Sequence, residues 1–232
     1  MAIAFNALAN MSTSTAGAES YAGTAGTPAA DDLLICMVAA TATTAAGGMT
    51  GQWTWTKLTS FTYNSGVDSM YVFWAYASAA TATTPTFTCT GDAATACEIY
   101  CLRVTGSSGI QVPCICQFKT ATGASTNPPV TMYGAINTNN GCISLVAENG
   151  TQSSGSTFTA PTGWGAAVQA GTGTSPRHAT AVSSRVSGET GSTITWTKAD
   201  SSPWGLIVME ICLLGGRQMS PSGGAYSSPM FY

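Results

Sequence analysis

Eight cysteines are the side chains of this chain that could most directly bind a metal or form a covalent bond. Cys97 and Cys101 lie on one face of an expected strand, but at about 3.3 Å per residue they are about 13 Å apart, too far for a disulfide or a shared zinc ion. Cys114 and Cys116 are separated by one residue, and an extended backbone would splay their side chains along the strand. The other four lie in apolar runs: Cys36, Cys89, Cys142 and Cys212. The cysteines are therefore expected to be small buried hydrophobic residues, with cross-strand disulfides as the first alternative and a metal site as the second.

His178 is the only histidine, and no G-x-S-x-G or other nucleophile motif accompanies it. It is expected at the surface, at the start of a strand. Asp31 and Asp32 are adjacent, so they would point to opposite faces of a strand instead of flanking a glycosidic bond. They are expected to cap the turn into the next strand, a role that Asn139 and Asn140 would fill further along the chain. The sequence thus predicts no catalytic residue, no metal ligand and no cofactor, and the protein is not expected to be an enzyme.

Two aromatic pairs have the spacing of residues that share one face of a strand. Trp53 and Trp55 form the first pair, and Trp74 and Tyr76 form the second. Exposed rows of this kind can stack on sugar rings, which would make these four residues a carbohydrate-binding surface. Aromatic residues at period two in a sandwich more often build its core, and that is the preferred expectation.

The composition predicts an uncharged surface that favours assembly. Charged residues make up 7% of the chain and the formal net charge is -3, which gives little self-repulsion. The seven Lys and Arg residues are scattered, and this argues against binding to nucleic acid. No apolar run is long enough for a membrane helix, and the N-terminus lacks the charged start of a signal peptide, so no membrane partner and no export are expected.

Short runs rich in Val, Ile, Thr, Tyr, Phe and Trp recur between Gly, Ser, Asn and Pro clusters, a pattern that predicts an all-β protein. In the first half, strands are expected at residues 3–8, 33–41, 53–61, 70–78, 86–90 and 97–105. In the second half, they are expected at residues 111–119, 130–133, 142–148, 156–159, 164–169, 178–187, 192–197 and 205–213. About six strands per half suits a jelly-roll or related Greek-key sandwich.

Two stretches of the chain repeat one pattern at an offset of about 108 residues. The run Asp32–Ala40 corresponds to Asn140–Glu148, and Glu98–Val104 corresponds to Leu206–Cys212. A repeat of this length is a whole domain or half-sandwich instead of a solenoid unit. The fold is therefore predicted to be two tandem related β-sandwich, jelly-roll-like halves, residues 1–108 and 109–216, followed by an extended C-terminal arm, residues 217–232.

The arm is the segment in which a contact with another protein is expected. Glycines and prolines prevent regular structure after residue 216, yet the chain ends in three large apolar residues. Burial of such a tip in a neighbouring subunit would stabilise the contact by about 1.5–3 kcal/mol per side chain before ordering costs. The alternative is that the arm folds back on its own sandwich. The candidate contact residues are Arg217, Tyr226, Met230, Phe231 and Tyr232.

The order of these elements resembles a group of tailed-bacteriophage virion proteins built from duplicated, jelly-roll-like β-sandwich modules. The resemblance rests on a turn into an apolar strand (Asp32–Ala40), the segment Pro161–Trp164, a strand ending in small residues (Met70–Ala80), a Thr-x-Thr strand (Thr86–Thr90) and a closing strand ending in Gly (Glu98–Gly106). It implies a virion structural protein, assembled in the host cytoplasm, of the capsid decoration (cement), head-fibre or tail-fibre type.

The partners implied by the resemblance are a major capsid or tail protein and copies of the chain itself, often as a trimer. Two other functions stay open on the residues alone. One is a carbohydrate-binding adhesin module of a tail fibre. The other is a self-polymerising extracellular fibre subunit, in which a terminal segment completes a neighbour's sheet.

Overall fold

The computed structural model describes residues 3–13, 20–41, 46–90, 96–105, 112–150, 157–172 and 177–214. Within these ranges the prediction of an all-β protein is confirmed, because every regular element except the single 3-10 turn η1 (Asn64–Gly66) is a strand. No helix in the same ranges is long and apolar enough to cross a membrane. The predicted arm, residues 217–232, lies outside the described residues.

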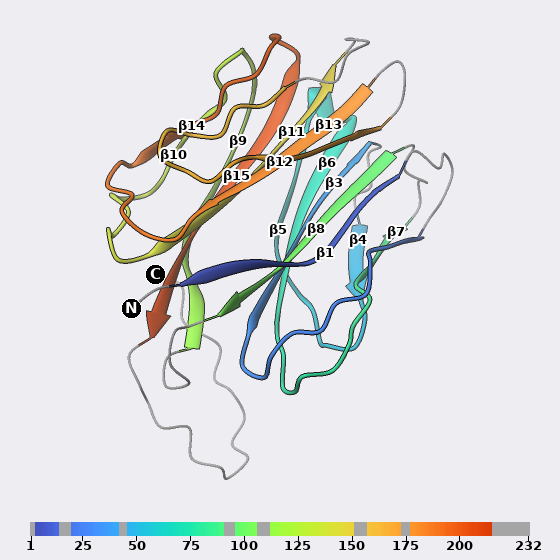
Figure 1. Ribbon diagram of the computed structural model, residues 1–232. Helices are drawn as coiled ribbons and strands as arrows, with labels where there is room; N and C mark the ends of the chain where they lie inside the picture. The colour runs from blue at the N-terminus through green and yellow to red at the C-terminus, as the bar shows by residue number, and fades with distance from the viewer. Residues whose placement is uncertain are drawn as a thin grey trace.

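Two five-stranded antiparallel sheets form the centre of the molecule (Figure 1). The first has the order β1-β8-β3-β6-β5, and the second has the order β12-β13-β11-β15-β9. The first sheet contains β1 (Ala4–Thr13), β3 (Leu33–Thr41), β5 (Thr56–Tyr63), β6 (Asp68–Tyr76) and β8 (Ala96–Thr105). The second contains β9 (Val112–Ala124), β11 (Gly141–Gly150), β12 (Val168–Thr172), β13 (Arg177–Arg185) and β15 (Pro203–Leu214).

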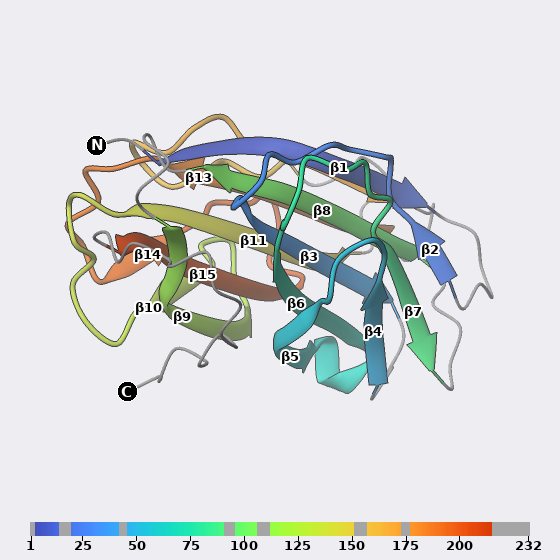
Figure 2. The same cartoon turned by 90° about the horizontal axis from the view of Figure 1, so that it is seen from below.

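Each large sheet is accompanied on its outer side by a small one. The first small sheet has the order β2-β7-β4, from β2 (Ser20–Ala22), β7 (Thr86–Thr90) and β4 (Ala46–Thr50). The second pairs β10 (Pro129–Thr131) with β14 (Thr193–Thr195), next to an isolated bridge between Thr159 and Thr197. In Figures 1 and 2 these small sheets lie on opposite sides of the central pair, so the molecule has four layers.

The two large sheets connect their strands in the same way. Numbered along the chain within each sheet, the strands lie side by side in the order 1-5-2-4-3 in both. All neighbouring strands are antiparallel.

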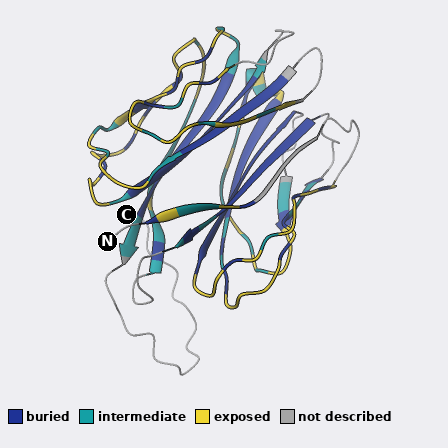
Figure 3. Cartoon of the chain, in the orientation of Figure 1, coloured by how far each residue is buried: buried dark blue, intermediate teal, exposed yellow. Residues whose placement is uncertain are grey.

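The central core lies between the large sheets and takes residues from both halves of the chain. Along β3, Leu33, Ile35 and Met37 belong to this core, while Leu34 and Cys36 face an outer core under the small sheet. Every residue of β3 is therefore buried, as Figure 3 shows for the central strands. A strand covered on both faces has no reason to alternate polar and apolar residues, which explains the continuous apolar run of its sequence.

At two glycines, side chains of the first sheet pack directly on the backbone of the second. A Cβ atom on Gly205 of β15 would lie 2.7 Å from Sδ of Met70 and 2.8 Å from Cδ1 of Tyr63. A Cβ atom on Gly141 of β11 would lie 2.8 Å from Cζ of Phe5. The packing distance of the two sheets at these points depends on the absence of a Cβ.

Most predicted strands are found, with some differences in position. The strand at Leu33–Thr41 and the strand at Thr86–Thr90 have the predicted bounds. The predictions at residues 53–61 and 164–169 begin too early, because β5 starts at Thr56 and β12 at Val168. Strands β2 and β4 were not predicted: β2 has three residues, and β4 has the sequence AGGMT, which carries almost no β-forming side chain and pairs only through its tertiary position.

Candidate functional site

The aromatic residues predicted from the sequence are half-buried. Trp53 and Trp55 pack against the outer core of the first half, and Trp74 and Tyr76 pack against the central core. The rings of Trp74 and Tyr76 meet edge to face with centroids 5.6 Å apart. The Tyr76 hydroxyl donates a hydrogen bond to the carbonyl oxygen of Pro113 at 2.9 Å. The five predicted arm residues, from Arg217 to Tyr232, lie outside the described residues.

The prediction that His178 lies at the surface is wrong. Its side chain is 1% exposed, at the start of β13 between the two large sheets. Its Nδ1 atom is hydrogen-bonded to the Glu98 carboxylate of β8, and its Nε2 atom lies 2.7 Å from the Tyr63 hydroxyl of β5. The strand position was predicted correctly, but the facing sheet that covers it comes from the other half of the chain.

His178 belongs to a group of buried polar side chains that we call the polar seam. The first sheet contributes Tyr63, Asp68, Glu98 and Tyr100, and the second half contributes Glu148, Asn149, His178, Thr180 and Lys198. The Asn149 amide donates to Oδ2 of Asp68 at 2.9 Å, and the hydroxyls of Tyr100 and Thr180 lie 3.0 Å apart. Oδ1 of Asp68 is buried and has no hydrogen-bond partner among the described residues. The seam thus connects the two halves by polar contacts beside the central core.

A buried lysine occupies the second-half side of the polar seam. Lys198 Nζ donates to Glu148 at 2.8 Å, to Asp200 at 2.9 Å and to the Ser202 hydroxyl at 2.8 Å. The side chain of Lys198 is 0% exposed and that of Glu148 is 2% exposed. All three protons of the ammonium group are used, as a buried charge requires.

Burial, neighbouring charges and hydrogen bonds shift the pKa values of several residues in and next to the polar seam. Burial lowers the pKa of His178, but Glu98, with help from Asp68 and Glu148, raises it more, so the net shift is upward. Burial raises the pKa of Tyr63 well above its ordinary value, and the nearby carboxylates add to this. Burial also raises the pKa of Glu148, against the opposing effect of Lys198. For Asp200, hydrogen bonds from Ser202 and Lys198 outweigh burial and lower the pKa to about 2.

In the part of the chain that the structure describes, the polar seam has the side chains of a catalytic triad, but the side chains of His178 and Glu98 are at most 1% exposed. Below the raised pKa of His178, both ring nitrogens carry protons, so the ring donates to Glu98 and to Tyr63. A groove of about 390 Å³ that includes Tyr63 is lined by Thr62–Gly66, Thr122–Ala124 and Pro203. Tyr63 is the one seam residue in its lining, and its hydroxyl points away to His178. The arrangement can hold two sheets in register, and it presents no nucleophile or base to this groove.

The described acidic residues are mostly inside the protein. The buried ones are Asp32, Asp68, Glu98, Glu148 and Glu210. Among the described basic side chains, Lys198 is buried, Arg103 lies 4.0 Å from Asp32, Arg185 lies 3.2 Å from Glu189, and Lys119 lies over the ring of Tyr133. Only Asp31 and Lys57 are exposed charged residues in the part of the chain that the structure describes. Charged residues are normally exposed, so this distribution is the reverse of the usual one.

The predicted turn before the Leu33 strand is confirmed, since Oδ2 of Asp32 accepts a hydrogen bond from the Ala29 amide at 2.7 Å. In the second half, the turn is made by Asn137, whose Oδ1 atom accepts from the Asn139 amide at 3.0 Å. Asn140 instead donates its side-chain amide to Glu210. The prediction that the side chains of Asn139 and Asn140 cap this turn is therefore wrong, and Asn137 has that role.

The prediction that all cysteines are buried free thiols is wrong for four of them. Two cross-strand disulfides join Cys36 to Cys101 and Cys116 to Cys212. Their partners are 65 and 96 residues apart in the chain, and strand pairing alone brings them together. Cys97 and Cys142 are buried free thiols as predicted, Cys89 is buried and in neither disulfide, and Cys114 is a half-buried free thiol.

The polar seam was missed because its residues come from five separate strands and the segment after β14. One signal was present in the sequence. Glu98 stands inside the apolar run Ala96–Val104, and a carboxylate in a strand buried on both faces requires a partner. Because a buried carboxylate needs a partner, His178, the only histidine, could have been suggested from the sequence. The strand arrangement that brings the two together could not.

Comparisons of the chain with protein-family models, with curated proteins and with solved structures gave no match. The function therefore has to be argued from the arrangement of the molecule itself.

Proposed function

We propose that the protein is a non-enzymatic structural component of a bacteriophage virion, a capsid decoration (cement) or head-fibre subunit that binds and stabilises the shell. The observation that carries this proposal is the placement of charge. The described surface consists mainly of hydroxyl, amide and methyl groups, while the carboxylates are buried in the polar seam and in turns. A surface of this kind neither repels copies of itself nor pays a large desolvation cost when it is covered.

The strand order supports the same proposal. In the first half, the order β1-β8-β3-β6-β5 in one sheet and β2-β7-β4 in the other supports the proposal of a jelly-roll-like arrangement. The order 1-5-2-4-3 in both large sheets, together with the 108-residue offset, supports a duplication. Jelly rolls are frequent among viral capsid and lectin domains, which is an argument by analogy of fold.

In this role the protein stabilises the capsid by binding to the outer surface of the shell. Copies, as trimers in the form we propose, bridge neighbouring shell subunits and bury an interface of about 1,600 Å² each. The arm, residues 217–232, adds a contact through Met230, Phe231 and Tyr232 on a neighbouring subunit.

Cosedimentation with capsids tests the proposal. Purified protein is mixed with capsids of its phage that lack it, and bound protein is measured at low and at high salt. Because the contact surface is uncharged, we expect saturable binding that changes less than about threefold between about 0.05 and 0.5 M salt. Absence of binding, or filaments formed by the protein alone, would contradict the proposal; filaments would favour the self-polymerising fibre.

Deletion of residues 217–232 tests the arm separately. We expect the truncated protein to keep its unfolding midpoint and to lose occupancy on the capsid. Full occupancy of the truncated protein would show that the arm does not anchor it, while leaving the shell-binding role itself in place.

The carbohydrate-binding function is the second candidate, favoured by one observation. The indole N–H groups of Trp53 and Trp55 are buried without a hydrogen-bond partner among the described residues. A sugar hydroxyl that reached them would satisfy two costly donors. A glycan array on wild type and Trp53→Phe tests this, with Trp164→Phe, which packs on the core of the second half, as the control. No glycan bound by the wild type, or equal binding by Trp53→Phe, would exclude a sugar site at Trp53.

A further inference from the structure

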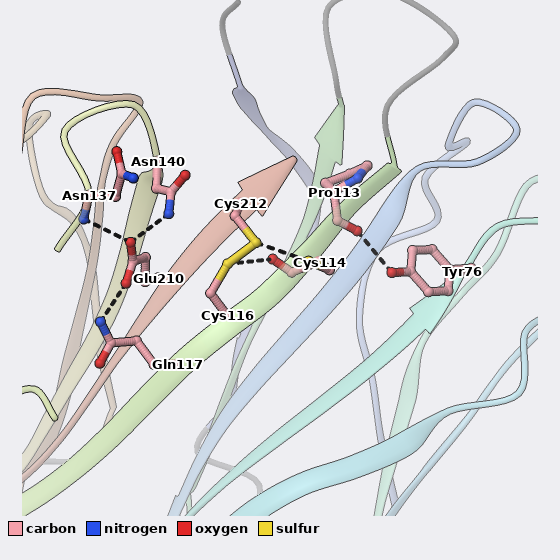
Figure 4. Close-up of a disulfide and its surroundings, with 9 residues drawn as sticks. All are labelled: Tyr76, Pro113, Cys114, Cys116, Gln117, Asn137, Asn140, Glu210 and Cys212. Atoms are coloured by element: carbon pink, nitrogen blue, oxygen red, sulfur yellow. Dashed lines mark hydrogen bonds between the residues drawn. A yellow bond between two sulfur atoms is a disulfide. The ribbon is translucent and has the colours of Figure 1, made fainter. Parts of the chain in front are cut away.

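Three cysteine sulfurs meet where β9 pairs with β15 (Figure 4). Cys114 lies directly opposite Cys212 in the register, and Cys116 is the extra residue of a β-bulge in β9. The three Sγ atoms all lie within 4.8 Å of one another, and those of Cys114 and Cys212 are 3.1 Å apart. In a regular strand, the Cys116 side chain would lie two residues further along than that of Cys114. The bulge instead brings Cys116 next to the same Cys212.

Hydrogen bonds hold this piece of β9 on both sides of the sulfurs. On one side the carbonyl of Pro113 accepts the Tyr76 hydroxyl, and on the other the Gln117 amide donates to Glu210. Glu210 is fixed in turn by the Asn137 amide and the Asn140 side chain, at 3.0 and 2.6 Å. Figure 4 shows these contacts around the sulfurs. The positions of the thiols are thus set by residues of both halves, as a preformed binding site requires.

We propose that Cys114, Cys116 and Cys212 bind one Zn²⁺ ion when the Cys116–Cys212 disulfide is reduced. Thiolates hold zinc at about 2.3 Å in a tetrahedron, which places their sulfurs about 3.8 Å apart. The three Sγ atoms lie within 4.8 Å of one another, so small side-chain shifts reach this spacing once the disulfide is opened. Thiolates also select zinc over Mg²⁺ or Ca²⁺. Cys116 is exposed, so the fourth position faces solvent and takes a water molecule. Both oxygens of Glu210 are already hydrogen-bonded, so this carboxylate is not the fourth ligand.

The step that opens the site needs a reductant, which is a dithiol. The dithiol breaks the bond between Cys116 and Cys212, its two electrons and two protons pass to these sulfurs, and it becomes a cyclic disulfide. Zinc then replaces the protons of the three thiols, which are released to solvent. The site does not depend on the proposed virion role.

Zinc content of the full chain tests the proposal. Oxidised and dithiol-reduced protein are each incubated with Zn²⁺, freed of unbound metal by gel filtration under nitrogen, and measured by mass spectrometry of the metal. We expect one zinc per chain in the reduced protein and none in the oxidised protein. We expect Cys116→Ser to weaken zinc binding by more than about tenfold, since loss of an outer-sphere contact alone costs that much.

Cys142→Ala is the matched control, because it removes a free thiol that lies in a different core, and it should keep one zinc per chain. Alkylation of the wild type with iodoacetamide, mapped by peptide mass spectrometry, avoids the risk that a variant misfolds. Zinc should protect Cys114, Cys116 and Cys212 together. Reduced protein without zinc, or equal zinc in wild type and Cys116→Ser, would overturn the proposal.

Discussion

The contact between His178 and Glu98 joins the two halves of the chain through one buried pair. Both side chains are at most 1% exposed, so each depends on the other for compensation of its charge. Such a pair stabilises a protein little more than apolar residues of similar volume would. Loss of one member, however, leaves an uncompensated charge buried in the interior. The pair is therefore expected to favour the one alignment of the two sheets in which His178 and Glu98 meet, more than to add to the overall stability.

Glu98→Ala is expected to lower the free energy of unfolding by about 3–5 kcal/mol, because it leaves the buried His178 ring without its carboxylate partner. Denaturant unfolding measures the loss. Lys57→Ala, which removes an exposed charge, should change the same quantity by less than about 0.5 kcal/mol. A Glu98→Ala protein as stable as the Lys57→Ala protein would show that the buried pair has no role in the fold.

The raised pKa of His178 makes the stability depend on pH in a defined direction. The folded protein binds the His178 proton more tightly than the unfolded chain does, in which the pKa of a histidine is near 6.5. The contribution is therefore complete below pH 6.5 and is lost as the pH rises through the folded pKa. We expect the unfolding free energy of wild type minus that of His178→Gln to fall across this window. A difference that stays constant with pH would contradict the assignment.

At the scale of elements, the sequence predicted strands well and sheets poorly. The run at Leu33–Thr41 was recognisable because β-branched and apolar residues fill it, and burial on both faces removes any alternation. Nothing local distinguishes the face of β3 in the central core, next to β11 and β9, from its face in the outer core. The pairing partners lie up to about a hundred residues away, so the disulfides and the polar seam could not be predicted either.

Gly205 allows β15 to lie close to the first sheet, because it has no Cβ. We expect Gly205→Ala to lower the free energy of unfolding by about 1–3 kcal/mol, since its Cβ would overlap Met70 and Tyr63. Gly48→Ala is the matched control, because a Cβ there meets nothing within 4 Å. Thermal and denaturant unfolding give both values. Equal stability of the two variants would show that the sheets can separate at this point without cost.

At the scale of the whole molecule, neither half has a complete interior of its own. The central core takes Leu33, Ile35 and Met37 from the first half and Ile143, Ile207 and Met209 from the second. Isolated halves would leave these side chains in water. The two sheets are thus expected to fold as one cooperative unit.

Expression of residues 1–108 and 109–232 as separate chains tests this dependence. Each fragment alone is expected to bind the dye ANS and to unfold without a sharp transition, because an apolar face stays exposed. Coexpressed fragments should copurify and unfold cooperatively. A first fragment that is monomeric, does not bind ANS and unfolds cooperatively would refute the shared core as the source of stability.

Because the first half is synthesised before the second, its apolar inner face is exposed for part of translation. The inner face of the first sheet is complete once Thr105 has been made, but the strand that covers it ends at Leu214, 109 residues later (214 − 105). At about 5–20 residues per second, the ribosome leaves this apolar face uncovered for about 5–20 s. During that time, neighbouring nascent chains on the same messenger RNA present the same face to one another. A chaperone that binds extended apolar strands would therefore be expected to act on this protein before its second half emerges.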